Sequence, residues 1–237
     1  MRGIDENIIK IKVKKKIKKA FKNFMQEKKN FVLGIAVVFI PLIYESLGII
    51  ELEKNMIPYT LSPLLTRELQ SFLGTDGVIA YFSSYYYFLV QLLILGSLGT
   101  VIFFSKKPWV YFMAVLICFG IDSLFYFFFP LAPPVRTGEA VPVRLILFPI
   151  SDHVITAKYS AFPSGHIMST FMGFLICRKE GFRKMEILFL TNTVIMSFII
   201  VYLGEHYLID SFGGILLAVS GFKVAHWIEE YTSGYEQ

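Results

Sequence analysis

Residues 78–104 contain no charged side chain. A helix needs about 20 mostly apolar residues to cross the hydrocarbon core of a bilayer, and this stretch is longer than that. Comparable apolar runs lie at about 31–50, 108–130, 163–177, 185–203 and 206–228. Because lipid cannot satisfy exposed backbone groups, such runs cross a membrane as helices. The sequence therefore predicts an all-α, polytopic membrane bundle with six transmembrane helices, of which the fourth is short and needs cover from its neighbours.

The composition excludes two other classes of protein. Of all residues, 55% are hydrophobic and only 17% are charged, and the mean hydropathy is +0.59. Charged residues come nearer a quarter in soluble domains, and disordered chains are far less apolar. The two cysteines, Cys118 and Cys177, both sit in apolar runs, so neither a disulfide framework nor a zinc cluster is expected.

Positive charge is concentrated at the start of the chain, where Arg2 is followed by ten lysines between Lys10 and Lys29. Apolar residues recur there every three to four positions, which predicts an amphipathic helix on anionic lipid. A lysine run is also typical of nucleic-acid-binding arms, but no globular partner domain accompanies this one, so no nucleic-acid partner is expected. We divide the chain into a basic cytoplasmic arm at 1–30 and a membrane domain at 31–230.

The distribution of basic residues predicts the orientation in the membrane. With the N-terminus in the cytoplasm and six spans, 17 basic residues fall on the inner side and 5 on the outer side. Cytoplasmic loops carry the excess of lysine and arginine in membrane proteins. We therefore expect a multi-pass protein of the cell membrane whose even-numbered spans begin at the extracytoplasmic face.

Two stretches outside the spans have patterns of their own. Ser62 and Pro63 offer an N-cap and a first-turn proline to an amphipathic helix that Gly74 would end. This helix fits the outer membrane interface, and an ordinary amphipathic connector is the equal alternative. The loop that leads into the fourth span, within 131–165, is long enough to be functional.

A group of mostly polar residues lies at the outer ends of the predicted spans. They are Arg136 after the third span, Ser164, Gly165 and His166 at the start of the fourth, and Glu205, His206 and Asp210 at the start of the sixth. Helix N-termini present free N–H groups and a partial positive charge. Two such ends beside basic residues predict a site for an anion, with phosphate as the natural ligand.

The two histidines suggest what this site does to phosphate. His206 and Asp210 are four residues apart, which places both on one face of a helix. A carboxylate that holds one ring nitrogen leaves the other as a lone pair, as a nucleophilic or basic histidine requires. His166 can then protonate a departing alkoxide. Each histidine alone reads better as a polar anchor, but the pair on one side of the membrane indicates phosphate ester chemistry without metal or cofactor.

Two segments carry a resemblance to a known family. AFPSGH at 161–166 and GEHYLIDSFGG at 204–214 resemble the second and third motifs of the type 2 phosphatidic acid phosphatase (PAP2) superfamily. The resemblance covers roughly residues 78–228. It implies a membrane helical bundle that acts on lipid phosphates.

The resemblance also implies roles for single residues. His206 would be the nucleophile that forms a phosphohistidine, Asp210 would orient it, and His166 would protonate the leaving oxygen. Ser164 and Gly165 would donate hydrogen bonds to phosphate oxygens.

The sequence departs from the phosphatase pattern at two places. Where the third motif carries a serine-arginine pair, this chain has Ile199 and Ile200. The first motif is replaced by LAPPVR at 131–136, which is similar to the branch that includes inositol phosphorylceramide synthases, enzymes that move a head group between lipids. Phosphate charge would then be met by Arg136, Lys158 or Arg144, in falling order. For Lys158, contact with lipid headgroups is the equal alternative.

These observations predict a metal-independent membrane lipid phosphatase or head-group phosphotransferase. Its substrate would be a lipid phosphate, a phospholipid or an isoprenyl diphosphate, and the nucleophile does not separate hydrolysis from transfer. A protein that binds or transports an anionic lipid without turnover is the alternative. Carboxylates within spans, Glu45 and Asp122, support that alternative.

Overall fold

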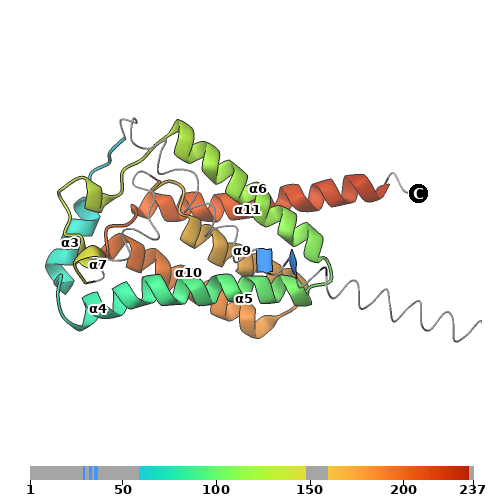
Figure 1. Ribbon diagram of the computed structural model, residues 1–237, viewed down its shortest axis with the longest axis horizontal. Helices are drawn as coiled ribbons and strands as arrows, with labels where there is room; N and C mark the ends of the chain where they lie inside the picture. Colours follow the sequence, from blue (N-terminus) through green and yellow to red (C-terminus); the bar gives the residue numbers. More distant parts are fainter. Residues whose placement is uncertain (1–28, 30–31, 34, 37–58, 148–159, 235–237) are drawn as a thin grey trace, which may run out of the picture.

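The computed structural model of the protein describes residues 29, 32, 33, 35, 36, 59–147 and 160–234 (Figure 1). This described part is all-helical and contains no strand, with two isolated β-bridges that join Leu131 to Tyr59 and to Ser160. Its helices are, in chain order, α3 (Leu64–Leu73), α4 (Val78–Tyr85), η2 (Tyr86–Val90), α5 (Gln91–Phe104), α6 (Pro108–Phe128), η3 (Pro134–Arg136), α7 (Val143–Leu147), α9 (Gly165–Glu180), α10 (Arg183–Tyr202) and α11 (Leu208–Gly234).

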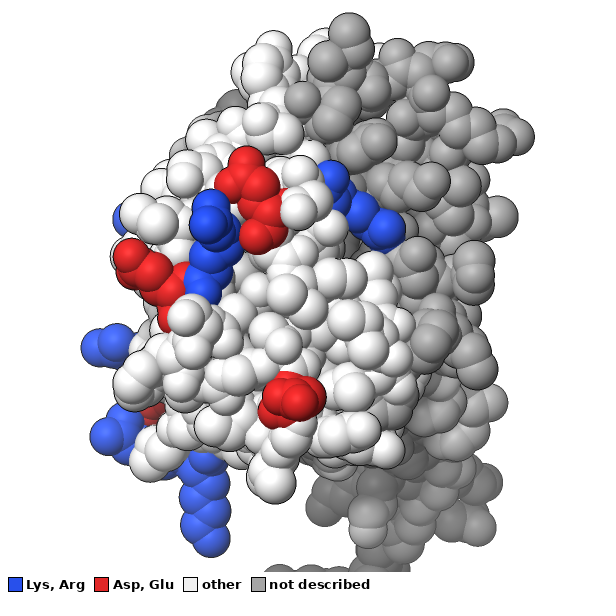
Figure 2. Space-filling model, turned by 90° about the vertical axis from the view of Figure 1, so that its left-hand side faces the viewer, with Lys and Arg blue, Asp and Glu red and all other residues white. Residues whose placement is uncertain are grey.

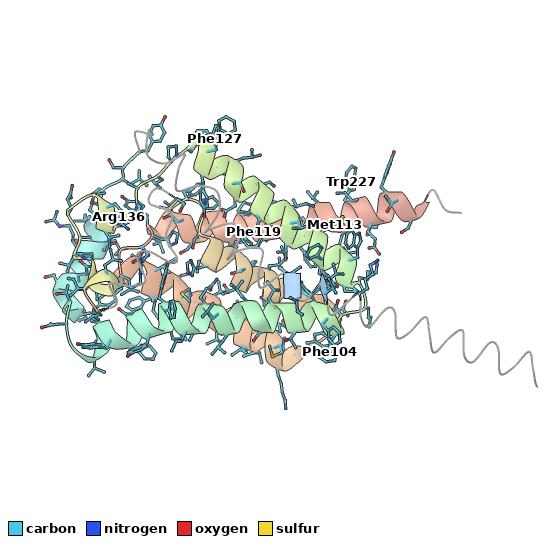
Figure 3. All side chains as sticks on the ribbon, in the orientation of Figure 1. Phe104, Met113, Phe119, Phe127, Arg136 and Trp227 are labelled. Carbon is cyan, nitrogen blue, oxygen red and sulfur yellow. The ribbon has the colours of Figure 1, made fainter. Side chains whose placement is uncertain are left out.

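Four helical segments are long and apolar enough to cross a membrane. They are Val78–Phe104, which joins α4, η2 and α5, and then Pro108–Phe128, Arg183–Tyr202 and Leu208–Ser233. Figure 1 shows α6 inclined to the other three, which run roughly along the long axis of the molecule. Figure 3 shows apolar side chains such as Phe104 and Trp227 on the outside of the bundle, where both are exposed. Four of the six predicted spans are therefore confirmed as helices of spanning length, and the chain is a helical membrane protein.

The two remaining predicted spans differ from these four. The run at 31–50 lies almost wholly outside the described residues. The basic arm, apart from Lys29, and Lys158 also lie outside them. The run at 163–177 is α9, a helix of 16 residues. It packs against α5, α6, α10 and α11, and most of its side chains are buried. The neighbouring helices thus provide the cover that so short a helix needs within lipid, while the total of six spans stays a prediction.

The ends of α9 follow from its sequence. Ser164 is the N-cap, and its Oγ accepts a hydrogen bond from the N–H of Ile167. Gly181 ends the helix in the left-handed region at φ 80°, a conformation that glycine adopts at little cost. Arg178 and Lys179 stand in the last turn, where the helix dipole favours positive charge. Together these signals hold α9 to a length that places its N-terminus inside one end of the bundle.

Helix α3 buries two polar side chains and exposes several apolar ones, beside the exposed charged residues Arg67 and Glu68. Thr66 Oγ1 donates to Val201 O at 3.0 Å, and Gln70 Nε2 donates to Tyr202 O at 3.0 Å. Its exposed side chains include Leu64, Leu65 and Phe72, the last 85% exposed. Figure 2 views the end of the molecule that carries α3 and α7 and shows a largely uncharged surface.

This arrangement fits the outer membrane interface, the first of the two interpretations offered by the sequence. Gly74 ends the helix as predicted, at φ 81°. The predicted start is wrong by one residue, because α3 begins at Leu64 and Pro63 rather than Ser62 occupies the N-cap position. Pro63 has no side-chain acceptor to offer, but its carbonyl accepts from the N–H of Arg67 at 3.0 Å and so starts the helix.

Candidate active site

The N-termini of α9 and α11 meet at a close contact between backbones. The N–H of Ser164 donates to Asp210 O at 3.0 Å. An ideal Cβ on Gly214 would lie 2.5 Å from Ser164 O and 3.0 Å from Met168 N, so only glycine allows this approach. Gly214 therefore has a structural reason, which is to bring both histidine-bearing segments together.

His206 lies in a turn before α11, not on it, which corrects the predicted helix start at 206. Gly204 adopts φ 74°, and the N–H groups of Glu205 and His206 both donate to Ile200 O, at 2.9 and 3.2 Å. The chain thus wraps around the last turn of α10 before α11 begins at Leu208. The turn is held in place because Gly204 O accepts from Val135 N at 3.0 Å.

The nearest partner of the His206 ring is a backbone carbonyl. His206 Nδ1 lies 2.7 Å from Ala161 O and 3.4 Å from Asp210 Oδ2. A carbonyl oxygen only accepts hydrogen bonds, so Nδ1 carries a proton, and in the neutral ring Nε2 is the nitrogen with the lone pair. The sequence assigned this orienting role to Asp210 alone, whereas in the structure the shorter contact of Nδ1 is with the carbonyl oxygen of Ala161.

Asp210 has a second task at the start of α11. Its Oδ2 accepts from the N–H of Tyr207 at 2.7 Å, and the residue is fully buried. The carboxylate thereby fixes the residue that follows His206 and lies close to the ring at the same time. Tyr207 is itself held, because its hydroxyl donates to Leu61 O at 3.1 Å, and burial raises the pKa of that hydroxyl above its ordinary value.

His166 lies in the first turn of α9 and faces His206. The centroids of the two rings are 5.9 Å apart, in an edge-to-face arrangement. The other neighbour of His166 is Tyr87, with ring centroids 4.5 Å apart. Tyr87 belongs to η2, a π-helical stretch in the first described span, and such stretches are often found at functional sites. The predicted pair of histidines is thus brought together by the fold.

Ser164 and Gly165 lie beside the histidines, but Ser164 has less to offer a phosphate than expected. Its N–H is bonded to Asp210 and its Oγ caps the helix, and the residue is fully buried. Gly165 and His166 belong to the first turn of α9, where N–H groups have no acceptor within the helix. These two N–H groups are the better placed donors for an anion.

The three basic residues considered for phosphate charge have different positions. Arg136 is partly exposed at the end of η3, next to Val135, which bonds to Gly204 in the turn that carries His206. Figure 3 shows Arg136 at the same end of the molecule as α3 and α7. Lys158 lies outside the described residues. Arg144, ranked last by the sequence, is buried with 1% of its surface exposed.

Arg144 forms an ion pair within the protein. Its Nε lies 2.6 Å from Glu205 Oε1, and the two side chains are 1% and 5% exposed. The guanidinium carbon lies 5.2 Å from the centroid of the Tyr87 ring, over its face. Arg144 therefore contacts the residue before His206 and the ring that packs on His166.

Sequence reasoning missed three of these features. Ala161 acts through its carbonyl, which no residue type signals, and Tyr87 is one of several neighbouring tyrosines in an apolar run. Glu205 was named at the start of the sixth span, but its pairing with Arg144 was missed, although a carboxylate at the end of an apolar run must find a partner when buried. Among the described residues, no group of three or more His, Cys, Asp or Glu side chains is arranged to hold a metal ion.

Comparison with known proteins identifies the family. The family model of the PAP2 superfamily matches residues 64–224, which include every described helix from α3 to α10 and most of α11. No curated protein and no solved structure matches the chain. The match covers more than half of the chain, so the resemblance seen in the two histidine motifs is confirmed, and this membrane protein belongs to the PAP2 superfamily.

Proposed function

We propose that the protein transfers the phosphoryl group of a lipid phosphate or lipid diphosphate, or the phosphorylated head group of a phospholipid, through a phosphohistidine on His206. The observation that carries the proposal is the short contact between His206 Nδ1 and Ala161 O. It favours the tautomer of the neutral ring in which Nε2 has the lone pair, and this is the form that attacks phosphorus. Membership of the PAP2 superfamily supports phosphoric ester chemistry at a coarser level.

The reaction has two steps in this proposal. His206 Nε2 attacks phosphorus, the bond from phosphorus to the lipid oxygen breaks, and His166 donates a proton to that oxygen. An acceptor hydroxyl then attacks the phosphohistidine, the bond from phosphorus to nitrogen breaks, and His166 takes up the proton of the acceptor. The edge-to-face arrangement of the two rings, with centroids 5.9 Å apart, supports these complementary roles.

The acceptor decides between two outcomes. Water makes the protein a lipid phosphatase, and a lipid or polyol hydroxyl makes it a head-group phosphotransferase. By resemblance, the absence of the serine-arginine pair favours the transferase branch. Ile199 and Ile200, which stand at those two positions, are buried apolar residues in the core. Gly165 within the PSGH segment is typical of the phosphatases, so both outcomes stay within the proposal.

Release of inorganic phosphate from a panel of lipid phosphates and isoprenyl diphosphates tests the proposal. Purified protein is assayed in detergent beside His206→Ala and His226→Ala, the latter a histidine near the C-terminal end of α11. We expect His206→Ala to lose about 10³-fold or more in turnover, as removal of a nucleophile does, and His226→Ala to keep it. If the acceptor is a lipid or polyol hydroxyl, no inorganic phosphate is released. The assay is then the transfer of acid-labile label to His206 from a phospholipid labelled at phosphorus.

Full turnover by His206→Ala would overturn the enzyme mechanism. Lipid binding without turnover or phosphohistidine in the wild type would instead favour the alternative, a protein that binds or transports an anionic lipid. In that case binding is expected to depend on Arg136 and to survive in His206→Ala.

We also propose that the histidine end faces the extracytoplasmic side, with the N-terminus in the cytoplasm. The distribution of basic residues supports this orientation. Single cysteines at Asp76 and Lys184, exposed at opposite ends of the bundle, test it in intact cells. A membrane-impermeant maleimide should label Asp76→Cys and spare Lys184→Cys, and the reverse pattern would invert the topology. The native cysteines provide a low background because both are fully buried.

A further inference from the structure

Besides their direct contact, the two histidines are linked by a chain of contacts between other side chains. Arg144 bonds to Glu205, the residue before His206, at 2.6 Å. The same guanidinium lies over the ring of Tyr87, and Tyr87 packs on His166. One side chain from α7 thus contacts the immediate supports of both rings.

Burial and charge decide what Arg144 does at this place. A cation that binds substrate phosphate must be accessible to the substrate, and its charge must not already be compensated by a carboxylate of the protein. Arg144 is 1% exposed, and its charge is compensated by Glu205 at hydrogen-bond distance. A bonded pair of this kind is held rigidly, because separating the charges in a medium of low dielectric is costly. Phosphate contact is therefore better left to Arg136 and to the N–H groups of α9.

The partners of Arg144 come from separate elements of the fold. Glu205 belongs to the turn between α10 and α11, and Tyr87 belongs to η2. Packing alone would let these elements shift by small distances, because apolar contacts have little directionality. A directional ion pair to one element and a cation over an aromatic face on the other fix their relative position.

We propose that Arg144 is a positioning residue that sets the distance between His166 and His206. It fixes the backbone at His206 through Glu205, and it fixes the ring of His166 through Tyr87. This inference rests on the proposed function, in which both rings act on one phosphoryl group. Misplacement of a reacting group by about 1 Å costs on the order of 10²-fold in rate, so loss of Arg144 should lower turnover more than binding.

The kinetic test uses variants of the ion pair in the purified full chain. We expect Arg144→Met to lower kcat about 10- to 100-fold and to change KM less than about twofold, and Arg144→Lys to recover part of kcat. Arg144→Met combined with Glu205→Gln should lose less than the product of the single losses, because the double variant leaves no uncompensated charge. Lys107→Met, which breaks an ion pair at the opposite end, is the matched control and should leave kcat unchanged.

A chemical measurement tests the same proposal without turnover. Diethylpyrocarbonate modifies histidine rings, and the rate at each ring is read by peptide mass spectrometry. We expect Arg144→Met to raise the rates at His166 and His206 by about threefold or more, since both supports open more often. The rate at His226 should stay unchanged, and a parallel rise there would indicate general loosening and overturn the proposal.

The outcomes separate this inference from the proposed function. A rise in KM at constant kcat in Arg144→Met would make Arg144 a phosphate-binding residue and overturn positioning. Unchanged modification at both rings would also overturn it. If the wild type turns over no lipid, or if His206→Ala keeps full turnover, the proposed function fails, and the modification rates still decide whether Arg144 holds the two rings.

Discussion

The two ends of the bundle carry ion pairs of the same chemistry in opposite surroundings. At the histidine end, Arg144 and Glu205 are 1% and 5% exposed. At the other end, Lys107 and Glu229 lie 2.7 Å apart but are 49% and 24% exposed. Water screens the second pair and lets its charged groups exchange partners. The first pair is shielded from water, so its two groups stay together. The difference teaches that distance alone does not tell what an ion pair can hold in place.

The same contrast extends to the surfaces around the two pairs. The histidine end places polar side chains of α3 inside and apolar ones outside. At the other end, charged groups bond at the surface, where Glu180 accepts from the hydroxyl of Tyr111 at 2.6 Å and from the N–H of Lys106 at 3.0 Å. The first end thus combines a polar interior with exposed apolar side chains and an exposed ion pair, Arg67 with Glu139 at 3.5 Å, whereas the second carries its charged contacts nearer the surface.

Neutralising one partner of each pair gives the largest expected difference between the ends. Glu205→Gln keeps the shape of the side chain but leaves Arg144 buried without its counter-charge, which should lower the free energy of unfolding by about 3–5 kcal/mol. Glu229→Gln at the exposed pair should cost at most about 1 kcal/mol. Unfolding in detergent by titration with sodium dodecyl sulfate measures both. Equal losses would show that the two pairs have equivalent surroundings and would erase the contrast.

Alanine at Gly214 tests the close backbone contact on which the histidine end depends. The added methyl group would meet Ser164 O at 2.5 Å, so α9 and α11 must separate. Overpacking of this kind costs about 1–3 kcal/mol, and we expect turnover to fall with stability. Gly96→Ala is the matched control, because nothing lies within 4 Å of its Cβ position. Full activity of Gly214→Ala would mean that the histidines do not depend on this contact.

The sequence predicts the helices well and the site only in part, for different physical reasons. Spans such as 78–104 and 108–130 are set by hydropathy, which is a local property of the chain, so their positions were confirmed to within a few residues. His206 and His166 were recognisable because side-chain chemistry and spacing are visible in the sequence. The proton on Nδ1 was not, because it depends on a carbonyl 45 residues away.

The order of the basic residues shows the same limit. The sequence placed Arg136 first and Arg144 last, since proximity to a motif was the only guide. Burial depends on how α7 packs against α4 and is a property of the tertiary structure. The π-helical stretch that presents Tyr87 to His166 likewise leaves no mark in a run of aromatic residues.

A smaller effect is expected from the polar interior under α3. Thr66→Val keeps the shape of the side chain but removes the donor to Val201 O, a buried acceptor. The loss should be about 1 kcal/mol. Thr100→Val removes a bond of 2.8 Å to Gly96 O. That bond is exposed and lies within one helix, whereas the Thr66 bond is buried and joins α3 to α10, so Thr100→Val should lose much less. The same titration in detergent compares the two, and a larger loss at Thr100 would contradict a polar interior beneath α3.

The smallest change in stability is expected at Phe72, which nonetheless reports most directly on how the two ends meet the membrane. Phe72 is 85% exposed, so Phe72→Trp in a chain without Trp109 and Trp227 should alter the free energy of unfolding by about 0.5 kcal/mol or less. If α3 lies in the interface, lipids brominated near the headgroup should quench this tryptophan strongly. Lys179→Trp, exposed at the other end, should respond to aqueous acrylamide instead. Strong acrylamide quenching and weak bromolipid quenching at Phe72 would instead place α3 in water and make it an ordinary connector.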